Sequence, residues 1–189
     1  MNRDEIELLD IIRDNSLEIG EFVLSSGKKS SYYLDCRVTT LHPRGALLSA
    51  RLLLRAIRRH RIAAAAIGGM TLGADPIVAA VTVVSAIDGT PLPAFIVRKE
   101  AKTHGARRRI EGWRGAPGSR VVIVDDVCTS GGSLMEACRA AESEGYQVAA
   151  TMCIVDRLET ASGKLKARYP FHSLFTVRDL LPEGSERLA

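Results

Sequence analysis

VVIVDDVCTSGGS, residues 121–133, begins with four consecutive β-branched residues and continues with two adjacent carboxylates, small polar residues and two glycines. An uninterrupted β-branched run is typical of a parallel strand buried on both faces. Residues 134–144 then have the apolar spacing of a helix. The stretch therefore predicts a strand, a turn and a helix, the repeating unit of an α/β fold.

The turn within this stretch has the composition of an anion site. Residues 129–132 can offer hydroxyls and backbone N–H groups at a helix N-terminus, where the helix dipole favours negative charge. Asp125 and Asp126 would repel a phosphate, so they should face sugar hydroxyls or a metal ion beside it. A phosphorylated sugar meets both demands. The alternative is an ordinary strand-to-helix turn in which the carboxylates cap the helix.

Two common nucleotide-binding motifs are absent from the stretch. It lacks the G-x-G-x-x-G pattern of dinucleotide-binding folds, and no Gly-Lys-Ser/Thr follows it as in a Walker loop.

The rest of the chain alternates between strand and helix patterns. Such alternation predicts a mostly parallel sheet flanked by helices, with ligands at the carboxyl ends of the strands. We expect one domain over residues 1–189, with residues 1–40 as an N-terminal hood. The expected helices are 4–13, 43–60 and one after Ala74, and the expected strands are 62–67, 94–97, 121–124 and 147–155, with two short extended segments within 20–37.

Composition narrows the class of protein. A chain of 189 residues with 46% hydrophobic and 25% charged residues suffices for one buried core. The net charge of +4 suggests anionic ligands without demanding nucleic acid. Four scattered cysteines indicate neither a zinc site nor a disulfide framework, so we expect reduced thiols and a cytoplasmic protein. The polar N-terminus and the lack of an 18-residue apolar run predict neither a signal peptide nor a membrane span.

A basic segment, RKEAKTHGARRRIEG, occupies residues 98–112 and has no apolar pattern. Loops of this length in a compact domain are usually functional or disordered. We interpret it as a loop that closes over a polyphosphate, screens charge on a leaving group and excludes water. The alternative is a solvated charged face. Another basic cluster is interpreted as structural, because cations complement the dipole at a helix C-terminus: Arg55, Arg58, Arg59 and Arg61.

Three further sites carry candidate chemistry. Asp156 and Arg157 end a predicted strand, where the guanidinium can hold a planar carboxylate, although a surface ion pair is the plainer interpretation. Tyr32 and Tyr33 are packing residues or pocket walls. Cys128 is interpreted as a spacer, since the neighbouring carboxylates should raise its pKa.

At this point the residues resemble a known family. VVIVDDVCTSGGS resembles the phosphoribosyl-diphosphate (PRPP) motif of type I phosphoribosyltransferases, and RKEAKTHG followed by IEG resembles the catalytic loop of orotate phosphoribosyltransferases. The resemblance extends over nearly the whole chain, including FVLSSGKKSSYYLDCR and GGMTLGADPI. It implies the type I phosphoribosyltransferase fold, a mostly parallel sheet with a small N-terminal hood.

The same resemblance implies an activity. Ribose 5-phosphate would pass from PRPP to orotate, giving orotidine 5′-monophosphate and pyrophosphate in de novo pyrimidine biosynthesis. It also implies Mg²⁺ carried on PRPP, with no protein ligand bound directly to the metal. A homodimer with shared active sites is implied as well, and neither nucleic acid nor membrane is an expected partner.

Residue roles follow by position in the family motifs. Asp125 and Asp126 would hold the ribose hydroxyls, and residues 129–133 would cradle the 5′-phosphate. Lys102 and His104 are the expected catalytic residues, with His104 a candidate proton donor. The full expected PRPP-binding set is Arg98, Lys99, Lys102, His104, Asp125, Asp126, Val127, Cys128, Thr129, Ser130, Gly131, Gly132 and Ser133, and the expected orotate contacts are Thr129 and Arg157.

Two positions differ from the more common family pattern. Ser25 and Leu72 stand where a lysine is often found, and Lys28 or Lys29 is a candidate replacement for the missing cations.

Two rival functions stay open on the sequence alone. A phosphoribosyltransferase for another base would share residues 121–133 but should lack the sequence of the 98–105 loop. A non-catalytic nucleotide-sensing regulator of the same fold that binds RNA is disfavoured, because aromatic and basic residues do not interleave.

Overall fold

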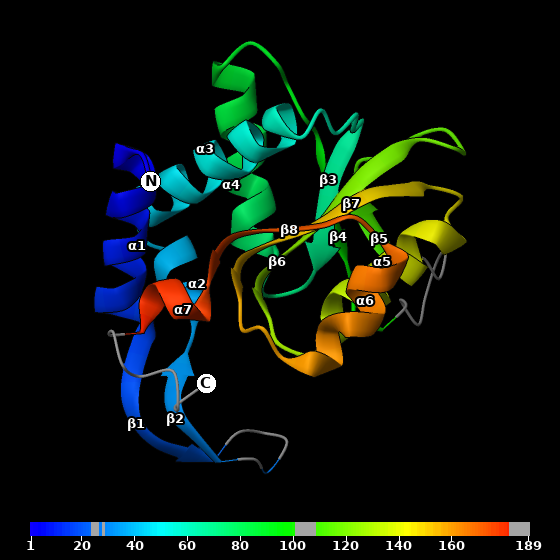
Figure 1. Ribbon diagram of the computed structural model, residues 1–189. Helices are drawn as coiled ribbons and strands as arrows, with labels where there is room; N and C mark the ends of the chain where they lie inside the picture. The colour runs from blue at the N-terminus through cyan, green and yellow to red at the C-terminus, as the bar shows by residue number, and fades with distance from the viewer. Residues whose placement is uncertain (24–26, 28, 101–108, 182–189) are drawn as a thin grey trace.

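The computed structural model describes residues 1–23, 27, 29–100 and 109–181. Within these ranges the body is a six-stranded sheet of order β5-β4-β3-β6-β7-β8, and every neighbouring pair is parallel except β4 with β5 (Figure 1). This is the mostly parallel α/β sheet that the sequence predicts. The strands are β3 (Ala66–Met70), β4 (Ala94–Val97), β5 (Ile110–Gly112), β6 (Arg120–Cys128), β7 (Gln147–Asp156) and β8 (Phe171–Thr176).

Helices cover both faces of the sheet (Figure 1). One buried cluster joins α1 (Arg3–Ser16), α3 (Pro43–Arg59) and α4 (Asp75–Ile87) to one face, and a second joins α5 (Gly132–Ser143) and α6 (Gly163–Arg168) to the other. The central strand β6 contributes alternate residues to each cluster. Val122 and Val124 belong to the first, and Val121 and Ile123 to the second. This double burial explains the uninterrupted β-branched run.

Local signals set the helix boundaries much as the sequence predicts. Pro43 opens α3, and Nδ1 of His42 accepts a hydrogen bond from the Gly45 N–H at 3.3 Å. Asn2 and Glu5 form a capping box at the start of α1. Arg55 pairs with Asp4 of α1 at 3.0 Å, in agreement with the structural role expected for its cluster.

The first strand of the sheet begins later in the sequence than predicted. The expected strand at 62–67 is wrong in its bounds, because β3 spans Ala66–Met70 and includes Gly68 and Gly69. A Cβ atom at Gly68 would lie 2.2 Å from the ring of Phe95, and one at Gly69 would lie 2.1 Å from the Val124 carbonyl oxygen. Close approach of neighbouring strands therefore requires glycines that strand propensity disfavours.

Two strands have no counterpart in the sequence prediction. β5 lies inside the basic segment 98–112 and pairs antiparallel with β4, whereas β8 forms the opposite edge of the sheet beside β7. Both are edge strands, for which burial imposes the weakest apolar pattern.

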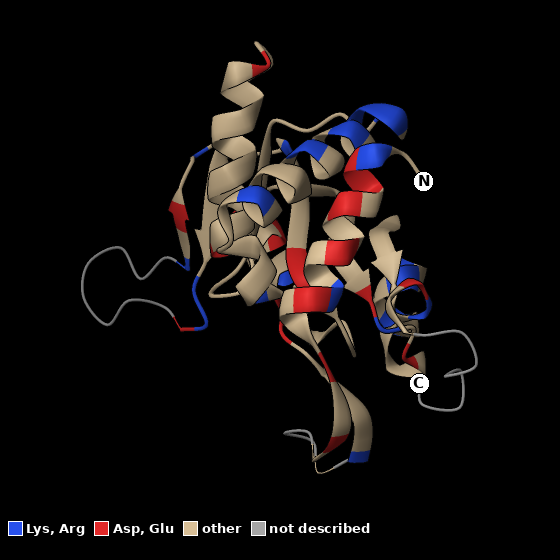
Figure 2. Cartoon of the chain, turned by 90° about the vertical axis from the view of Figure 1, so that its left-hand side faces the viewer, with Lys and Arg blue, Asp and Glu red and all other residues tan. Residues whose placement is uncertain are grey.

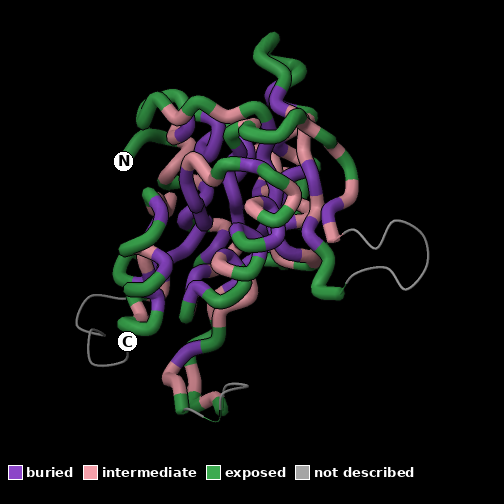
Figure 3. The backbone as a smooth tube through the Cα atoms, turned by 90° about the vertical axis from the view of Figure 1, so that its right-hand side faces the viewer, coloured by how far each residue is buried: buried purple, intermediate pink, exposed green. Residues whose placement is uncertain are grey.

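The N-terminal segment forms a hairpin that projects from the body. Strands β1 (Leu17–Val23) and β2 (Lys29–Leu34) pair antiparallel, and the short helix α2 (Cys36–Thr40) returns the chain to the body (Figures 1 and 2). Figure 3 shows that buried residues concentrate in the body, whereas most of the hairpin is intermediate or exposed.

The base of the hairpin packs against the C-terminal part of the described chain. Tyr32 forms a small buried cluster with Val177 of α7 (Val177–Leu180) and with Leu181. The guanidinium of Arg13 donates to the carbonyl oxygens of Asp179 and Leu180 at 2.5 and 3.3 Å. The Tyr32 cluster thus holds the base of the hairpin against α7, and the Arg13 hydrogen bonds join α1 to the same helix.

The described residues also bear on redox state and membrane association. Cys36, Cys128, Cys138 and Cys153 are all free thiols and all buried. None of the helices in the described ranges combines the length and apolar character needed to cross a bilayer.

Candidate functional site

Three loops meet at the carboxyl edge of the sheet. β3, β6 and β7 are neighbouring parallel strands, so the turn after Met70, the turn after Cys128 and residue Arg157 leave the sheet at the same edge (Figure 1). Parallel α/β sheets place ligands at this edge. The structure thus brings together the residues that the sequence assigns to the sugar, the phosphate and the carboxylate.

The two carboxylates lie within β6. The predicted strand end at Val124 is wrong, because β6 continues to Cys128, and Asp125 pairs in register with Cys153 of β7. Oδ1 of Asp125 accepts a hydrogen bond from the Asp126 N–H at 3.0 Å, and Oδ1 of Asp126 accepts one from the Val127 N–H at 2.9 Å. Neither carboxylate caps α5, because the N-cap residue is Gly131 and no side chain accepts a hydrogen bond there, so the helix-capping alternative is wrong.

The turn after β3 lies against this carboxylate pair. A Cβ atom at Gly73 would come within 2.6 Å of Oδ1 of both Asp125 and Asp126. Residues 71–74 thereby form a wall of the site. Leu72, which stands where a lysine is often found, is 66% exposed at this turn and makes no part of the buried core.

The pKa values of both carboxylates are raised, mainly because the two groups are withdrawn from water. Asp125 is 7% exposed, and desolvation followed by the charge of Asp126 raises its pKa well above the ordinary range. Desolvation also raises the pKa of Asp126. A pair of this kind is stabilised by hydroxyl donors or by a cation, and oxygen atoms are the ligands that Mg²⁺ prefers. Among the described residues, no group of three or more His, Cys, Asp or Glu could hold a metal ion.

The sequence prediction missed a contribution from α2. Burial raises the pKa of Asp126, and the charge of Asp35 adds to this shift. The hydrogen bond with Asp35 raises the pKa of Arg37, and the charge of Asp126 adds to that shift. Asp35 holds the Arg37 guanidinium by hydrogen bonds of 2.8 and 2.7 Å. The Asp35–Arg37 ion pair thus lies in electrostatic range of Asp126. The sequence signal was the Asp-Cys-Arg triplet that follows the two tyrosines.

The start of α5 has the geometry expected of a phosphate cradle. Gly131 caps the helix with a φ of 76°, and a Cβ atom there would lie 3.1 Å from the Leu165 side chain, so both backbone and packing require glycine. The first N–H groups of an α-helix lack intrahelical acceptors and can bind an anion. Ser130 is exposed beside them, and its Oγ accepts from the Gly132 N–H at 3.4 Å.

Cys128 agrees with its interpretation as a spacer. Its side chain is 1% exposed in the cluster beneath α5, which leaves only its backbone available to a ligand. The expected rise in its pKa is wrong, because a hydrogen bond with the Cys153 thiol lowers the pKa of Cys128. Burial of both thiols keeps Cys128 from acting as a nucleophile.

Arg157 follows the last residue of β7 and its backbone is held on both sides. Its N–H donates to the Cys128 carbonyl at 2.9 Å, and the preceding Asp156 carboxylate accepts from the Leu158 N–H at 2.9 Å and from Lys166 Nζ at 2.7 Å. Asp156 thus pairs with Lys166, and the plainer interpretation of Asp156 and Arg157 as a surface ion pair is wrong. The Arg157 side chain instead meets Tyr32, whose hydroxyl accepts from Nε at 2.9 Å.

The two described ends of the basic segment are hydrogen-bonded to each other. Arg98 and Arg109 exchange two hydrogen bonds, from the Arg98 N–H at 2.8 Å and from Arg109 Nε at 3.0 Å. Arg98 also lies 3.7 Å from Glu111, and Arg109 pairs with Glu136 of α5. Lys99 is exposed. The other expected cations of the segment, Lys102, His104, Arg107 and Arg108, lie outside the described residues, as do Ser25 and Lys28.

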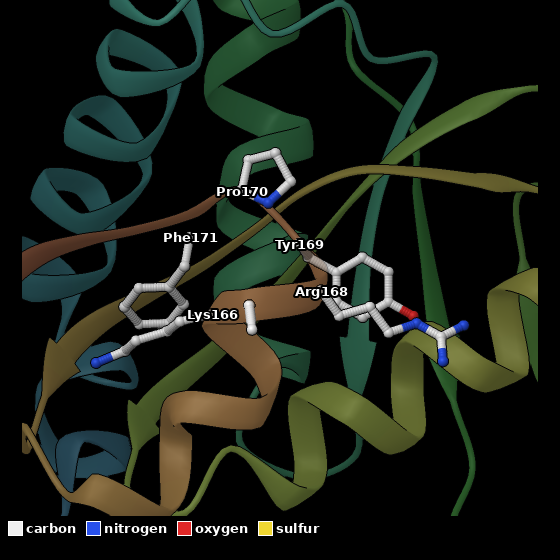
Figure 4. Close-up of a pocket in the computed structure, with 6 residues that line it drawn as sticks. Lys166, Arg168, Tyr169, Pro170 and Phe171 are labelled. Carbon is white, nitrogen blue, oxygen red and sulfur yellow. The ribbon is translucent and has the colours of Figure 1, made fainter.

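A surface hollow of about 390 Å³ lies elsewhere, along the end of α6. Figure 4 shows that its side chains diverge, with Lys166 and Phe171 on one side and Arg168 and Tyr169 on the other. None of the expected PRPP or orotate contacts lines it. It is lined by residues 166–171.

Comparisons with known proteins agree with this geometry. Residues 77–178 match the family model described as a phosphoribosyl transferase domain. The chain is 42% identical over 183 residues to the orotate phosphoribosyltransferase of Rhodopirellula baltica, with 94% of each chain covered.

Solved structures give the same relation. The orotate phosphoribosyltransferase of Mycobacterium tuberculosis H37Rv in complex with Fe(III) dicitrate matches with a TM-score of 0.82 and 36% identity, over 94% of this chain and 98% of that one. The structure of the same enzyme in complex with PRPP matches with a TM-score of 0.77 and 33% identity, again over 94% and 98%.

Proposed function

The chain belongs to the orotate phosphoribosyltransferase family, and from this premise we propose how its site performs the reaction. The enzyme transfers the ribose 5-phosphate of PRPP to orotate, giving orotidine 5′-monophosphate and pyrophosphate, a step of de novo pyrimidine biosynthesis. The observation that carries the proposal is the meeting of the Asp125–Asp126 pair, the Gly73 turn and the start of α5 at one sheet edge.

We assign one part of PRPP to each of these elements. The start of α5, with Thr129, Ser130 and Ser133, binds the 5′-phosphate through hydroxyls and N–H groups. Asp125 and Asp126 accept hydrogen bonds from the ribose hydroxyls, which replace the water that both carboxylates lose by burial, the main cause of their raised pKa values. These contacts hold the anomeric carbon in place for attack, so the enzyme supplies orientation before chemistry.

Bond making and breaking take place at the anomeric carbon. The ring nitrogen of orotate loses its N–H proton to water and forms the new bond as the bond to the pyrophosphate oxygen breaks and its electron pair leaves with pyrophosphate. The ribose gains oxocarbenium character, and cations near the leaving group stabilise the departing charge. We assign that role to Lys102 and His104, together with Arg98 and Lys99. Arg157, with Thr129, holds orotate, since a guanidinium matches a planar carboxylate.

Mg²⁺ and a second subunit complete the proposal. Mg²⁺ carried on PRPP would supply charge neutralisation at the pyrophosphate, and the two adjacent carboxylates of Asp125 and Asp126 are compatible with a divalent cation on the ligand beside them. We propose a cytoplasmic homodimer with shared sites and one domain per chain, in which residues 1–40 form the hood.

One assay tests the function. Purified protein with PRPP and Mg²⁺ should consume orotate, measured by its loss of absorbance, and should leave uracil, adenine, guanine and hypoxanthine unchanged. Uracil lacks the carboxylate, and an unpaired buried guanidinium costs on the order of 2–5 kcal/mol. Comparable turnover of uracil would contradict the role of Arg157, and turnover of a purine base alone would favour the rival phosphoribosyltransferase.

A further inference from the structure

Arg157 carries a largely desolvated charge with unused donors. Its side chain is 11% exposed, and Nε donates to the Tyr32 hydroxyl at 2.9 Å. The nearest carboxylate oxygen, on Glu159, lies 3.6 Å from the same Nε, beyond a good hydrogen bond. Within residues 1–23, 27, 29–100 and 109–181, neither terminal nitrogen of Arg157 has a hydrogen-bond acceptor. The terminal amino groups of a guanidinium with so little exposed surface favour a planar acceptor that can bind both of them.

Tyr32 is well placed to fix this side chain. It is 3% exposed and packs against Val177 and Leu181, so its ring has little freedom. The carbon at the centre of the Arg157 guanidinium lies 4.7 Å from the centre of that ring, within cation–π range. One residue of the N-terminal hairpin thus restrains the arginine by both a hydrogen bond and a ring face.

The neutral character of the Tyr32 hydroxyl matters for an anionic substrate. A carboxylate bound to the terminal nitrogens would compete with the substrate for their N–H groups. The Tyr32 hydroxyl accepts from Nε only, and Glu159 lies beside the same nitrogen, so both terminal amino groups are left for a planar carboxylate. The backbone of Arg157 is already fixed through Cys128 and Asp156, so Tyr32 removes the remaining freedom of the side chain.

We propose that Tyr32 is a positioning residue for recognition of the orotate carboxylate, acting through Arg157. The inference rests on the proposed function, because it takes Arg157 as the group that binds orotate. Pre-ordering of a long side chain lowers the entropy lost on binding. Loss of the hydroxyl should therefore weaken orotate binding and leave PRPP binding unchanged.

The first test compares two tyrosine-to-phenylalanine variants. Tyr32→Phe keeps the packed ring and removes one oxygen, so the fold should persist, as circular dichroism can verify. We expect the KM for orotate to rise about tenfold, equivalent to ~1.4 kcal/mol, with the KM for PRPP unchanged. Tyr169→Phe is the matched control, because Tyr169 is also buried, donates its hydroxyl to Glu142 at 2.8 Å and carries Arg168 over its ring. It should leave both KM values unchanged.

A double variant separates positioning from general packing. Arg157→Lys should raise the KM for orotate, and adding Tyr32→Phe should then raise it no further, because the hydroxyl acts only through the guanidinium. Independent, multiplying effects of the two substitutions would overturn the proposal, as would an unchanged KM for orotate in Tyr32→Phe alone. Failure of the wild-type protein to consume orotate would instead reject the proposed function itself.

Discussion

Gly73 and Asp125 approach so closely that a Cβ atom on the glycine would lie 2.6 Å from the Asp125 carboxylate oxygen. The turn after β3 and the centre of β6 are thus fitted to each other at the site. Neither residue reveals this from the sequence, because the two segments meet only in the folded sheet.

This contact predicts the effect of a single methyl group. Gly73→Ala should push the turn away from the carboxylates, lower turnover at limiting PRPP and cost about 1–3 kcal/mol of unfolding free energy, as is usual for overpacking. Gly163→Ala is the control, since a Cβ atom at Gly163 would meet nothing within 4 Å. Steady-state kinetics and urea unfolding measure both effects. A Gly73→Ala enzyme with wild-type kinetics would show that the turn is not part of the site.

Removal of both charges of the carboxylate pair should abolish activity and leave thermal stability unchanged or higher. Asp125→Asn with Asp126→Asn should abolish turnover, because the ribose contacts lose their charge. Both folded pKa values are raised from an ordinary value of 3.8, so the stability from these groups is present below that pH and is lost as pH rises through the folded values. At pH 7 the double variant should therefore melt at a temperature equal to or above that of the wild type.

The difference between the two melting temperatures should shrink as the pH falls, because the wild-type carboxyls then become protonated. Asp88→Asn, at the exposed end of α4, serves as the control for removal of a surface charge. A double variant that unfolds at neutral pH would show that the two groups have a structural role.

A stacked histidine pair should make the folded protein less stable in mildly acidic solution. The rings of His60 and His172 lie 4.0 Å apart, and burial, followed by the charges of His60 and Arg59, lowers the pKa of His172. A lowered folded pKa means that this stability is present above the unfolded value, near 6.5, and is lost as pH falls below it. His172→Phe keeps a stacking ring, so it should reduce the loss in thermal midpoint between pH 8 and pH 5. An equal loss in the variant would exclude this source.

The shared active site of the proposed dimer can be tested by subunit mixing. Lys102→Ala and the Asp125→Asn, Asp126→Asn variant should each be nearly inactive alone. After unfolding, mixing and refolding, about half of the dimers should be mixed, and one site in each would combine an intact carboxylate pair with an intact Lys102 from its neighbour. About a quarter of all sites should then recover activity.

Recovery requires that the subunits exchange, so light scattering and a tag on one variant must first verify mixed dimers. No recovery in verified mixed dimers would mean that Lys102 acts within its own subunit. The orotate assignment would be unaffected by that result.

Much of the fold could be predicted from the sequence, because many helices and strands depend on residues that lie close together in the chain. The β-branched run of β6, the glycines before α5 and Pro43 at the start of α3 all act within a few residues, so their elements could be predicted. Arg157 could be assigned to a strand end for the same reason. The motif around Asp125 also predicts a sugar and a phosphate, because charge and hydroxyl content indicate ligand chemistry before geometry does.

Tertiary structure alone decided which of these groups meet. The glycines of β3 are explained only by Phe95 and Val124 on the neighbouring strands, and the edge strand β5 forms only because β4 is there to pair with it. Tyr32 and Arg157 stand 125 positions apart, yet the hairpin and the end of β7 bring the hydroxyl to the guanidinium. Contacts of this kind depend on strand order and on close packing between distant segments, which no periodicity within one segment encodes.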